Sequence, residues 1–107
     1  MMKTIRNQWT LAVVFFAACA VSFAQSSGEA IYATKCQNCH GQTGLANSGV
    51  GRVMKVKPIN DPSVANMSEI KMIEAVNNGM GKMEAYKGSL TEAQIKASVI
   101  YFRTFLK

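Results

Sequence analysis

The chain has 107 residues, a net charge of +6, three cysteines and one histidine. A chain of this length is expected to form one domain. The charge gives no reason to expect nucleic-acid binding, and no platform of aromatic and basic residues supports it.

Residues 1–24 have the layout of a secretory signal peptide. Lys3 and Arg6 give a short positive start, an uncharged and mostly apolar stretch follows, and small residues precede the expected cleavage after Ala24. We therefore expect a signal peptide over 1–24, a mature domain over 25–107 and a periplasmic location. Because the two basic residues leave with the signal, the net charge of the mature domain falls to +4.

Two other interpretations of the N-terminal segment remain open. The apolar run could stay as an uncleaved anchor, although it is shorter than the roughly 18 residues expected of a spanning helix. Ala17 and Ala18 precede Cys19, which resembles part of a lipoprotein cleavage site and would place a lipid on that cysteine.

The mature domain retains only Cys36 and Cys39. A disulfide between them would close a tiny loop and add little stability. A domain this small therefore needs another staple, such as a cofactor.

The first half of the mature domain predicts one helix followed by irregular chain. Residues 28–39 are predicted to be helical. Residues 41–50 are polar and rich in glycine, so we expect a loop there, followed by a short helical turn within 51–57. Residues 58–62 are expected to be extended or to form a turn, because each proline restricts the residue before it.

The second half predicts two further helices. A helix over 68–78 can be capped by Asn66 or Ser68 and ended by Gly79. A longer helix over 91–106 begins with the capping-box sequence TEAQ and repeats apolar residues on one face. No segment shows sustained strand alternation, so the predicted fold class is all-α.

The sequence CQNCH, residues 36–40, carries the chemistry. The C-x-x-C-H pattern is the attachment signature for a c-type haem. Two thiols three positions apart on a helical turn can each form a thioether with one porphyrin, and the adjacent histidine can then bind the iron. We therefore predict one haem c attached through Cys36 and Cys39, with His40 as the proximal ligand.

Three other interpretations of this pentapeptide compete with haem attachment. Structural zinc needs four ligands, whereas the mature chain offers two cysteines and one histidine. A thioredoxin-like pair expects a strand–helix–strand setting, and no strand is predicted. The third interpretation is a chance occurrence of the pattern.

The second axial ligand decides what such a haem can do. A methionine would fill the sixth position and raise the potential, leaving no open site for substrate. Methionines at helical spacing are more often core residues, and Met67 and Met72 match that description. Met80 and Met83 lie in a glycine-rich connection that can arch over the haem, and Met54 lies in a loop region.

These motifs resemble those of the class I monohaem cytochromes c, in particular the small periplasmic bacterial type. The resemblance lies in CQNCHG (36–41), in the distal segment NGMGKMEAYKGSL (78–90) and in the C-terminal QIKASVIYFRTF (94–105). It implies a cytochrome c fold of three to four short helices around one covalently bound haem. It also implies that the N- and C-terminal helices cross near Gly28 and Tyr101.

The same resemblance implies the ligand set. Cys36 and Cys39 would be the thioether residues, His40 the proximal ligand and Met83 the distal ligand, with Met80 as the second choice. The family usually has proline directly after the ligand methionine, whereas this chain has Glu84. This substitution loosens the restraint on the loop and places a carboxylate near the haem edge. We also expect a carbonyl in the loop after the histidine to accept the second ring N–H.

The expected function is single-electron transfer between periplasmic or membrane redox partners, without catalysis. The alternatives are a haem with an open distal site for gas binding or peroxidase-like chemistry, and a non-catalytic subunit of a dehydrogenase or oxidase. A ring of lysines around the haem edge would attract partners that carry acidic patches. The candidate lysines are Lys35, Lys55, Lys57, Lys82 and Lys87.

Overall fold

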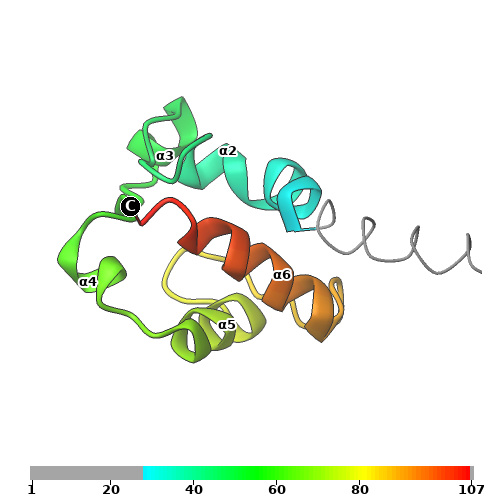
Figure 1. The fold of residues 1–107 in the computed structure, drawn as a ribbon. Coiled ribbons are helices and arrows are strands. Elements are labelled where there is room, and N and C mark those ends of the chain that lie inside the picture. The colour runs from blue at the N-terminus through cyan, green and yellow to red at the C-terminus, as the bar shows by residue number, and fades with distance from the viewer. Residues whose placement is uncertain (1–27, 107) are drawn as a thin grey trace, which may run out of the picture.

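The computed structural model describes residues 28–106, which form a helical domain (Figure 1). Residues 28–31 are helical and lead directly into the first named element. In chain order the elements are η1 (Tyr32–Cys36), α2 (Gln37–His40), α3 (Gly49–Val53), α4 (Pro62–Ala65), α5 (Glu69–Asn78) and α6 (Glu92–Arg103). Between 28 and 106 there are only two isolated β-bridges and no strand, so the all-α prediction is confirmed.

Helix α6 begins as the sequence predicts. The Thr91 hydroxyl accepts from the Gln94 N–H at 3.1 Å, and the Gln94 side-chain oxygen accepts from the Thr91 N–H at 2.9 Å. This reciprocal pair satisfies two amide groups that the first turn leaves without partners. The helix ends at Arg103, earlier than expected, because the chain then tightens into i→i−3 hydrogen bonds such as that from the Phe105 N–H to the Phe102 carbonyl.

Helix α6 packs against α5 to form the main core. The buried members of this core are Met72, Val76, Ile95 and Val99. Of the two candidate caps for α5, Ser68 is the one used, since its hydroxyl accepts from the Lys71 N–H at 3.2 Å. Gly79 ends the helix with a φ of +78°, a backbone angle that glycine tolerates best.

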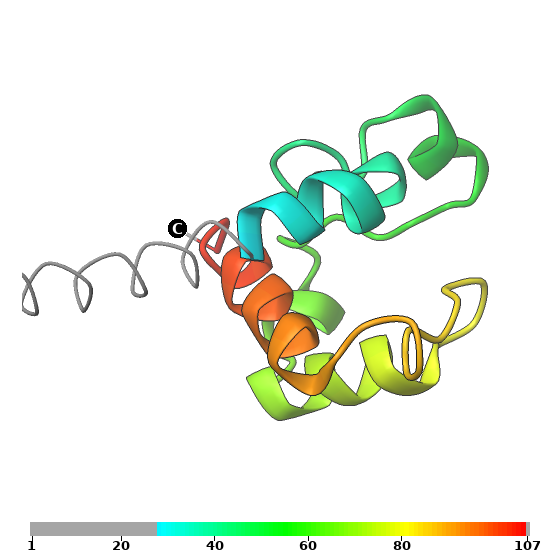
Figure 2. The same cartoon turned by 90° about the vertical axis from the view of Figure 1, so that its right-hand side faces the viewer.

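The N-terminal and C-terminal helices cross as expected (Figure 2). Gly28 is buried, and a Cβ added there would lie 2.5 Å from the Ala97 carbonyl oxygen, so only glycine permits this approach. One turn further along, the Tyr32 and Tyr101 rings meet with centroids 5.4 Å apart. Phe102 and Phe105 also pack against Tyr32, at centroid distances of 5.9 and 5.5 Å.

Two short helices differ from the sequence prediction. Helix α3 begins at Gly49, inside the expected loop, because the Ser48 hydroxyl caps the Gly51 N–H at 3.0 Å. Helix α4 was not predicted. Pro62 holds Asp61 in extended backbone, as expected, but it also occupies the first helical position, where its missing N–H costs nothing.

The predicted signal peptide over 1–24 and Cys19 lie outside the described residues. The structure therefore leaves cleavage, anchoring and lipidation as expectations. Among the helices of residues 28–106, none is long and apolar enough to cross a membrane.

Candidate functional site

The attachment sequence lies where the first helix changes its winding. Over Tyr32–Cys36 the helix is a π-helix, and the Gln37 N–H bonds to the carbonyl of Tyr32, five residues back. The chain then returns to α-helical winding over Gln37–His40. Such single π-turns insert one extra residue into a helix and often occur at functional sites. Here the widened turn ends at Cys36, the first residue of the attachment sequence.

Both cysteines of the attachment sequence are half-buried free thiols. Burial, followed by the proximity of Cys39, raises the pKa of the Cys36 thiol to about 11. Cys36 is therefore a neutral thiol at physiological pH when no metal is bound. From Gly28 to Leu106 no cluster of three potential ligands is arranged to hold a metal ion without a cofactor.

His40 is the last residue of α2 and is largely held by packing. Its ring lies edge-on to Phe102, with centroids 5.2 Å apart and planes at 63°. Burial lowers the pKa of the imidazole, which favours the neutral form that binds metals. The Nδ1 atom is buried and has no hydrogen-bond partner.

This unpartnered nitrogen corrects one expectation. We expected a carbonyl of the following loop to accept from the ring, but no carbonyl accepts a hydrogen bond from Nδ1, and three nearby carbonyls accept from other groups. The carbonyl of His40 itself accepts from the Ala46 N–H at 2.8 Å, and that of Gly44 from the Ile59 N–H at 2.8 Å. The Gly41 carbonyl accepts from the Tyr32 hydroxyl at 2.6 Å.

The distal segment forms a tight turn opposite the attachment helix. The Met80 N–H donates to the Met83 carbonyl at 3.1 Å, and the Met83 N–H donates to the Met80 carbonyl at 2.9 Å. The Tyr86 hydroxyl lies 3.1 Å from both the Lys35 carbonyl oxygen and a Glu84 carboxylate oxygen, and it can donate to either. Tyr86 therefore links the distal segment to the attachment helix.

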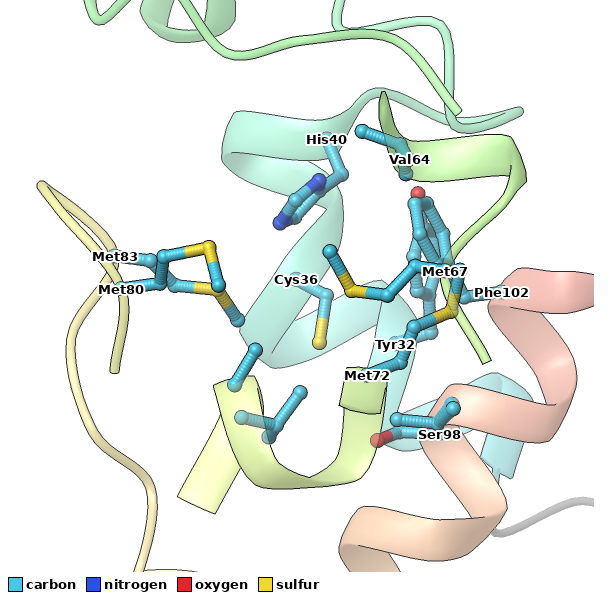
Figure 3. Close-up of a pocket in the computed structure, with 13 residues that line it drawn as sticks. Tyr32, Cys36, His40, Val64, Met67, Met72, Met80, Met83, Ser98 and Phe102 are labelled. Carbon is cyan, nitrogen blue, oxygen red and sulfur yellow. The ribbon is translucent and has the colours of Figure 1, made fainter. Parts of the chain in front are cut away.

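Two cavities adjoin between the attachment helix and the distal turn, with volumes of about 140 Å³ and 500 Å³. Both are lined by Cys36, His40, Val64, Met80 and Met83. The smaller cavity extends into the core past Met72, Val99 and Phe102, and its lining is almost wholly apolar. Figure 3 shows this cavity, with His40 above it and the two thioethers of the distal turn beside it.

The larger cavity opens toward the surface and is lined by polar groups as well. Cys39, Met54, Glu84 and Tyr86 contribute to it, together with three lysines. Those lysines are Lys35, Lys57 and Lys82. Lys55 and Lys87, which the sequence also suggested, do not line either cavity.

The residues present fit a c-type haem. An apolar interior, two thiols at its edge, a neutral imidazole on one side and thioethers on another are the groups that such a cofactor requires. A chain this small also gains from a large apolar group at its centre. The structure thus places Cys36, Cys39, His40 and Met83, the residues predicted to hold a haem, along the larger cavity.

Sequence reasoning missed several lining residues. Val64 reaches both cavities from α4, which was not predicted, and Ser98 lines the smaller cavity from α6. Phe102 was recognised only as part of an apolar helix face, yet it is the residue that packs on His40. Its period with Ile95 and Val99 placed it in the core, but nothing in the sequence pointed to the imidazole.

Comparisons with known proteins give one family match. Residues 23–102 match the family model described as cytochrome C oxidase, cbb3-type, subunit III. No curated protein matches the chain. The matched range contains the attachment helix, the distal turn and most of α6.

Proposed function

The chain belongs to the cytochrome c family described as cbb3-type cytochrome c oxidase subunit III, which transfers electrons through c-type haem, and from this we propose that it is a single-electron carrier with one haem c. The cofactor would be attached through Cys36 and Cys39 and held between His40 and Met83. One observation carries this proposal above the others: these four residues, from the attachment helix and the distal turn, line one cavity.

The protein's residues would each have a defined task. The thiols of Cys36 and Cys39 would fix the ring to the first helix, and the neutral imidazole of His40 would supply a nitrogen ligand. The thioether of Met83 would close the opposite side and so exclude oxygen or a substrate. The haem, when bound, supplies an iron that changes its charge by one unit. The apolar lining from Met72, Val99 and Phe102 keeps water away from it.

Absorption and mass spectrometry of the purified mature protein test this proposal. We expect a reduced-minus-oxidised spectrum of a c-type cytochrome and a mass that includes one covalent haem. A near-infrared charge-transfer band between methionine and iron is expected in the oxidised protein. A colourless polypeptide without a covalent haem adduct would contradict the proposal. A high-spin spectrum would instead favour the open-site alternative, in gas binding or peroxidase-like chemistry.

The family description favours a second candidate, an electron-transfer subunit of a terminal oxidase. In that case the same haem would pass electrons within a stable complex rather than between free proteins. Purification from the native membrane in mild detergent distinguishes the two. Co-purification with an oxidase supports the subunit, whereas recovery in the periplasmic fraction supports the free carrier.

The charge around the larger cavity supports partners with acidic docking surfaces. Lys35, Lys57 and Lys82 line its mouth, and none of the three forms an ion pair with another described residue. Three unpaired cations at the edge of a redox site would speed the approach of an acidic protein. Electron-transfer rates should therefore fall as ionic strength rises. A rate that does not change with salt would contradict this part of the proposal.

We also propose that the protein acts in the periplasm. The support is the signal-peptide pattern of residues 1–24. N-terminal sequencing of the native protein tests it, since cleavage should expose Gln25. A chain that begins with a lipid-modified Cys19 would establish the anchored form instead.

A further inference from the structure

The distal turn carries two methionines on the same face. Met80 and Met83 form a directly opposed antiparallel pair that exchanges both backbone hydrogen bonds, with Gly81 and Lys82 between them. In such a pair the two Cα atoms are about 5.5 Å apart and both side chains lie on one side of the turn. Gly81 has a φ of +58°, which suits the first central residue of a tight hairpin turn.

Both thioethers point toward the same space. Each methionine lines the smaller and the larger cavity together with His40. Figure 3 shows the two side chains side by side, with their sulfur atoms directed from the turn toward His40 and Cys36. The family resemblance gives the ligand role to Met83 and places Met80 second, but in the structure both methionines line the same two cavities.

Packing does not account for Met80. The residue is 58% exposed and is one of six large apolar residues exposed in the described part of the chain. By contrast, Met72 is 5% exposed in the core, and its sulfur lies 3.7 Å from the Arg103 guanidinium. Met80 is therefore not a core residue, and unlike the more exposed Val53 and Ile70 it lines both cavities.

The backbone of the distal turn is closely packed at one end and open at its tip. A Cβ at Gly79 would lie 2.7 Å from the Met83 carbonyl oxygen, so this end of the turn is closely packed. Around Gly81 an added Cβ would meet no atom within 4 Å, so the tip of the turn has open space on that side. The open side leaves room for the tip of the turn to shift, and both methionines line the cavities next to His40.

We propose that Met80 is a second axial ligand, which binds the haem iron whenever the Met83 sulfur is removed or dissociates. This inference rests on the proposed function, since it requires a haem held by His40. In the exchange one sulfur–iron bond breaks and an equivalent one forms. No electron or proton is transferred, because both ligands are neutral thioethers. The turn therefore keeps the distal position closed even when its first ligand leaves.

Leucine variants of the haem-loaded mature protein test the proposal. Met83→Leu should keep a near-infrared methionine–iron band and a low-spin spectrum, because Met80 takes over. Met80→Leu should keep the band through Met83, and the double variant should lose it and become high-spin. The matched control is Met54→Leu, which removes a thioether that lines the larger cavity from the segment after α3. It should leave the band unchanged in both the native and the Met83→Leu background.

The outcomes separate this inference from the function on which it rests. A native protein that lacks the band contradicts the proposed ligation itself. A native protein with the band, together with a folded Met83→Leu variant as high-spin as the double variant, overturns only the role of Met80. Loss of the band from Met83→Leu upon addition of Met54→Leu would assign the second ligand to Met54 and also overturn the proposal.

A measurement on the unaltered protein covers the case in which Met83→Leu does not fold. With ¹³C-methyl-labelled methionine in the reduced protein, the ligand methyl has a strongly shifted signal. We expect an exchange cross-peak between that signal and a second methionine, which Met80→Leu removes. An unfolded Met83→Leu variant combined with no exchange in the native protein would count against Met80 as a ligand.

Discussion

At the scale of single residues, Tyr32 shows how one side chain joins the helix crossing to the site. Its ring contacts Tyr101, Phe102 and Phe105, and its hydroxyl donates to the Gly41 carbonyl at 2.6 Å. Burial raises the pKa of this phenol, so it remains a neutral donor. The hydrogen bond fixes the residue that follows His40, and the ring supports the aromatic wall behind the imidazole.

Replacement of Tyr32 by phenylalanine isolates that hydrogen bond. We expect Tyr32→Phe to lower the free energy of unfolding by about 1 kcal/mol, because a buried carbonyl loses its best donor. Urea denaturation of the haem-loaded protein, followed by circular dichroism, measures the change. Tyr101→Phe is the control, since no described residue accepts a hydrogen bond from its hydroxyl. Equal effects of the two variants would contradict the role given to the Tyr32 hydroxyl.

Tyr86 leads to a prediction about alkaline pH. Burial first, and then its interaction with Glu84, raise the pKa of the Tyr86 phenol to about 12. In the unfolded chain the value is near 10, so between pH 10 and 12 the unfolded state releases a proton that the folded state retains. The contribution of Tyr86 to stability is complete below pH 10 and decreases as the pH rises toward 12.

The Tyr86→Phe variant should therefore lose less stability than the native protein over that range. At pH 8 it should be less stable, because it lacks the hydroxyl that bridges Lys35 and Glu84. Urea midpoints measured from pH 8 to 12 test both statements. Since every other titrating group is shared, the difference between the two curves reports on Tyr86. Parallel curves for the variant and the native protein would show that the ionisation of Tyr86 does not affect stability.

At the scale of elements, local signals predicted what local chemistry controls. The capping box at Thr91 and the serine cap at Ser68 both formed, because each needs only residues within one turn. Helix α4 and the π-turn over Tyr32–Cys36 were missed. The first is short and begins at a proline that also indicates extended chain, and the second begins at Tyr32, which contacts α6 residues far away in the sequence.

The same difference between local and long-range signals applies to the candidate site. The spacing of CQNCH predicts three of the candidate residues, because those residues lie close together in the sequence. The common direction of Met80 and Met83 could not be read from the sequence, since it requires knowledge that they pair across a two-residue turn. Likewise, the contact of His40 with Phe102 joins residues 62 positions apart.

The helix crossing gives a prediction at this scale. Gly28→Ala should lower the free energy of unfolding by about 1–3 kcal/mol, because the new methyl would lie 2.5 Å from the backbone of Ala97 and the helices must separate. Gly49→Ala is a matched control in α3, where an added Cβ meets nothing within 4 Å. That control should be neutral or stabilising, since alanine is the better helix former. Thermal unfolding of the two haem-loaded variants measures this difference. Similar melting temperatures would contradict the close approach of the two helices at Gly28.

For the whole molecule, the cofactor replaces the core that the chain does not build by itself. The described residues bury only a few large side chains completely, namely Tyr32, Ile59 and Ile95. The two cavities lie between the attachment helix, the distal turn and the pair of α5 and α6. Without a group in that space, Met83 and His40 lack contacts across it, and the distal turn is held mainly by Tyr86.

The mature chain without haem should therefore be poorly folded. A Cys36→Ala, Cys39→Ala variant of residues 25–107, prepared without haem, should show reduced helical circular dichroism and no cooperative thermal transition. The physical reason is that a domain of this size is close to the limit at which its own apolar burial offsets chain entropy. The haem-loaded native protein, measured alongside, should melt cooperatively. A sharp, native-like melt in the variant would mean that α5, α6 and the aromatic crossing suffice to hold the fold, with the cofactor contributing function alone.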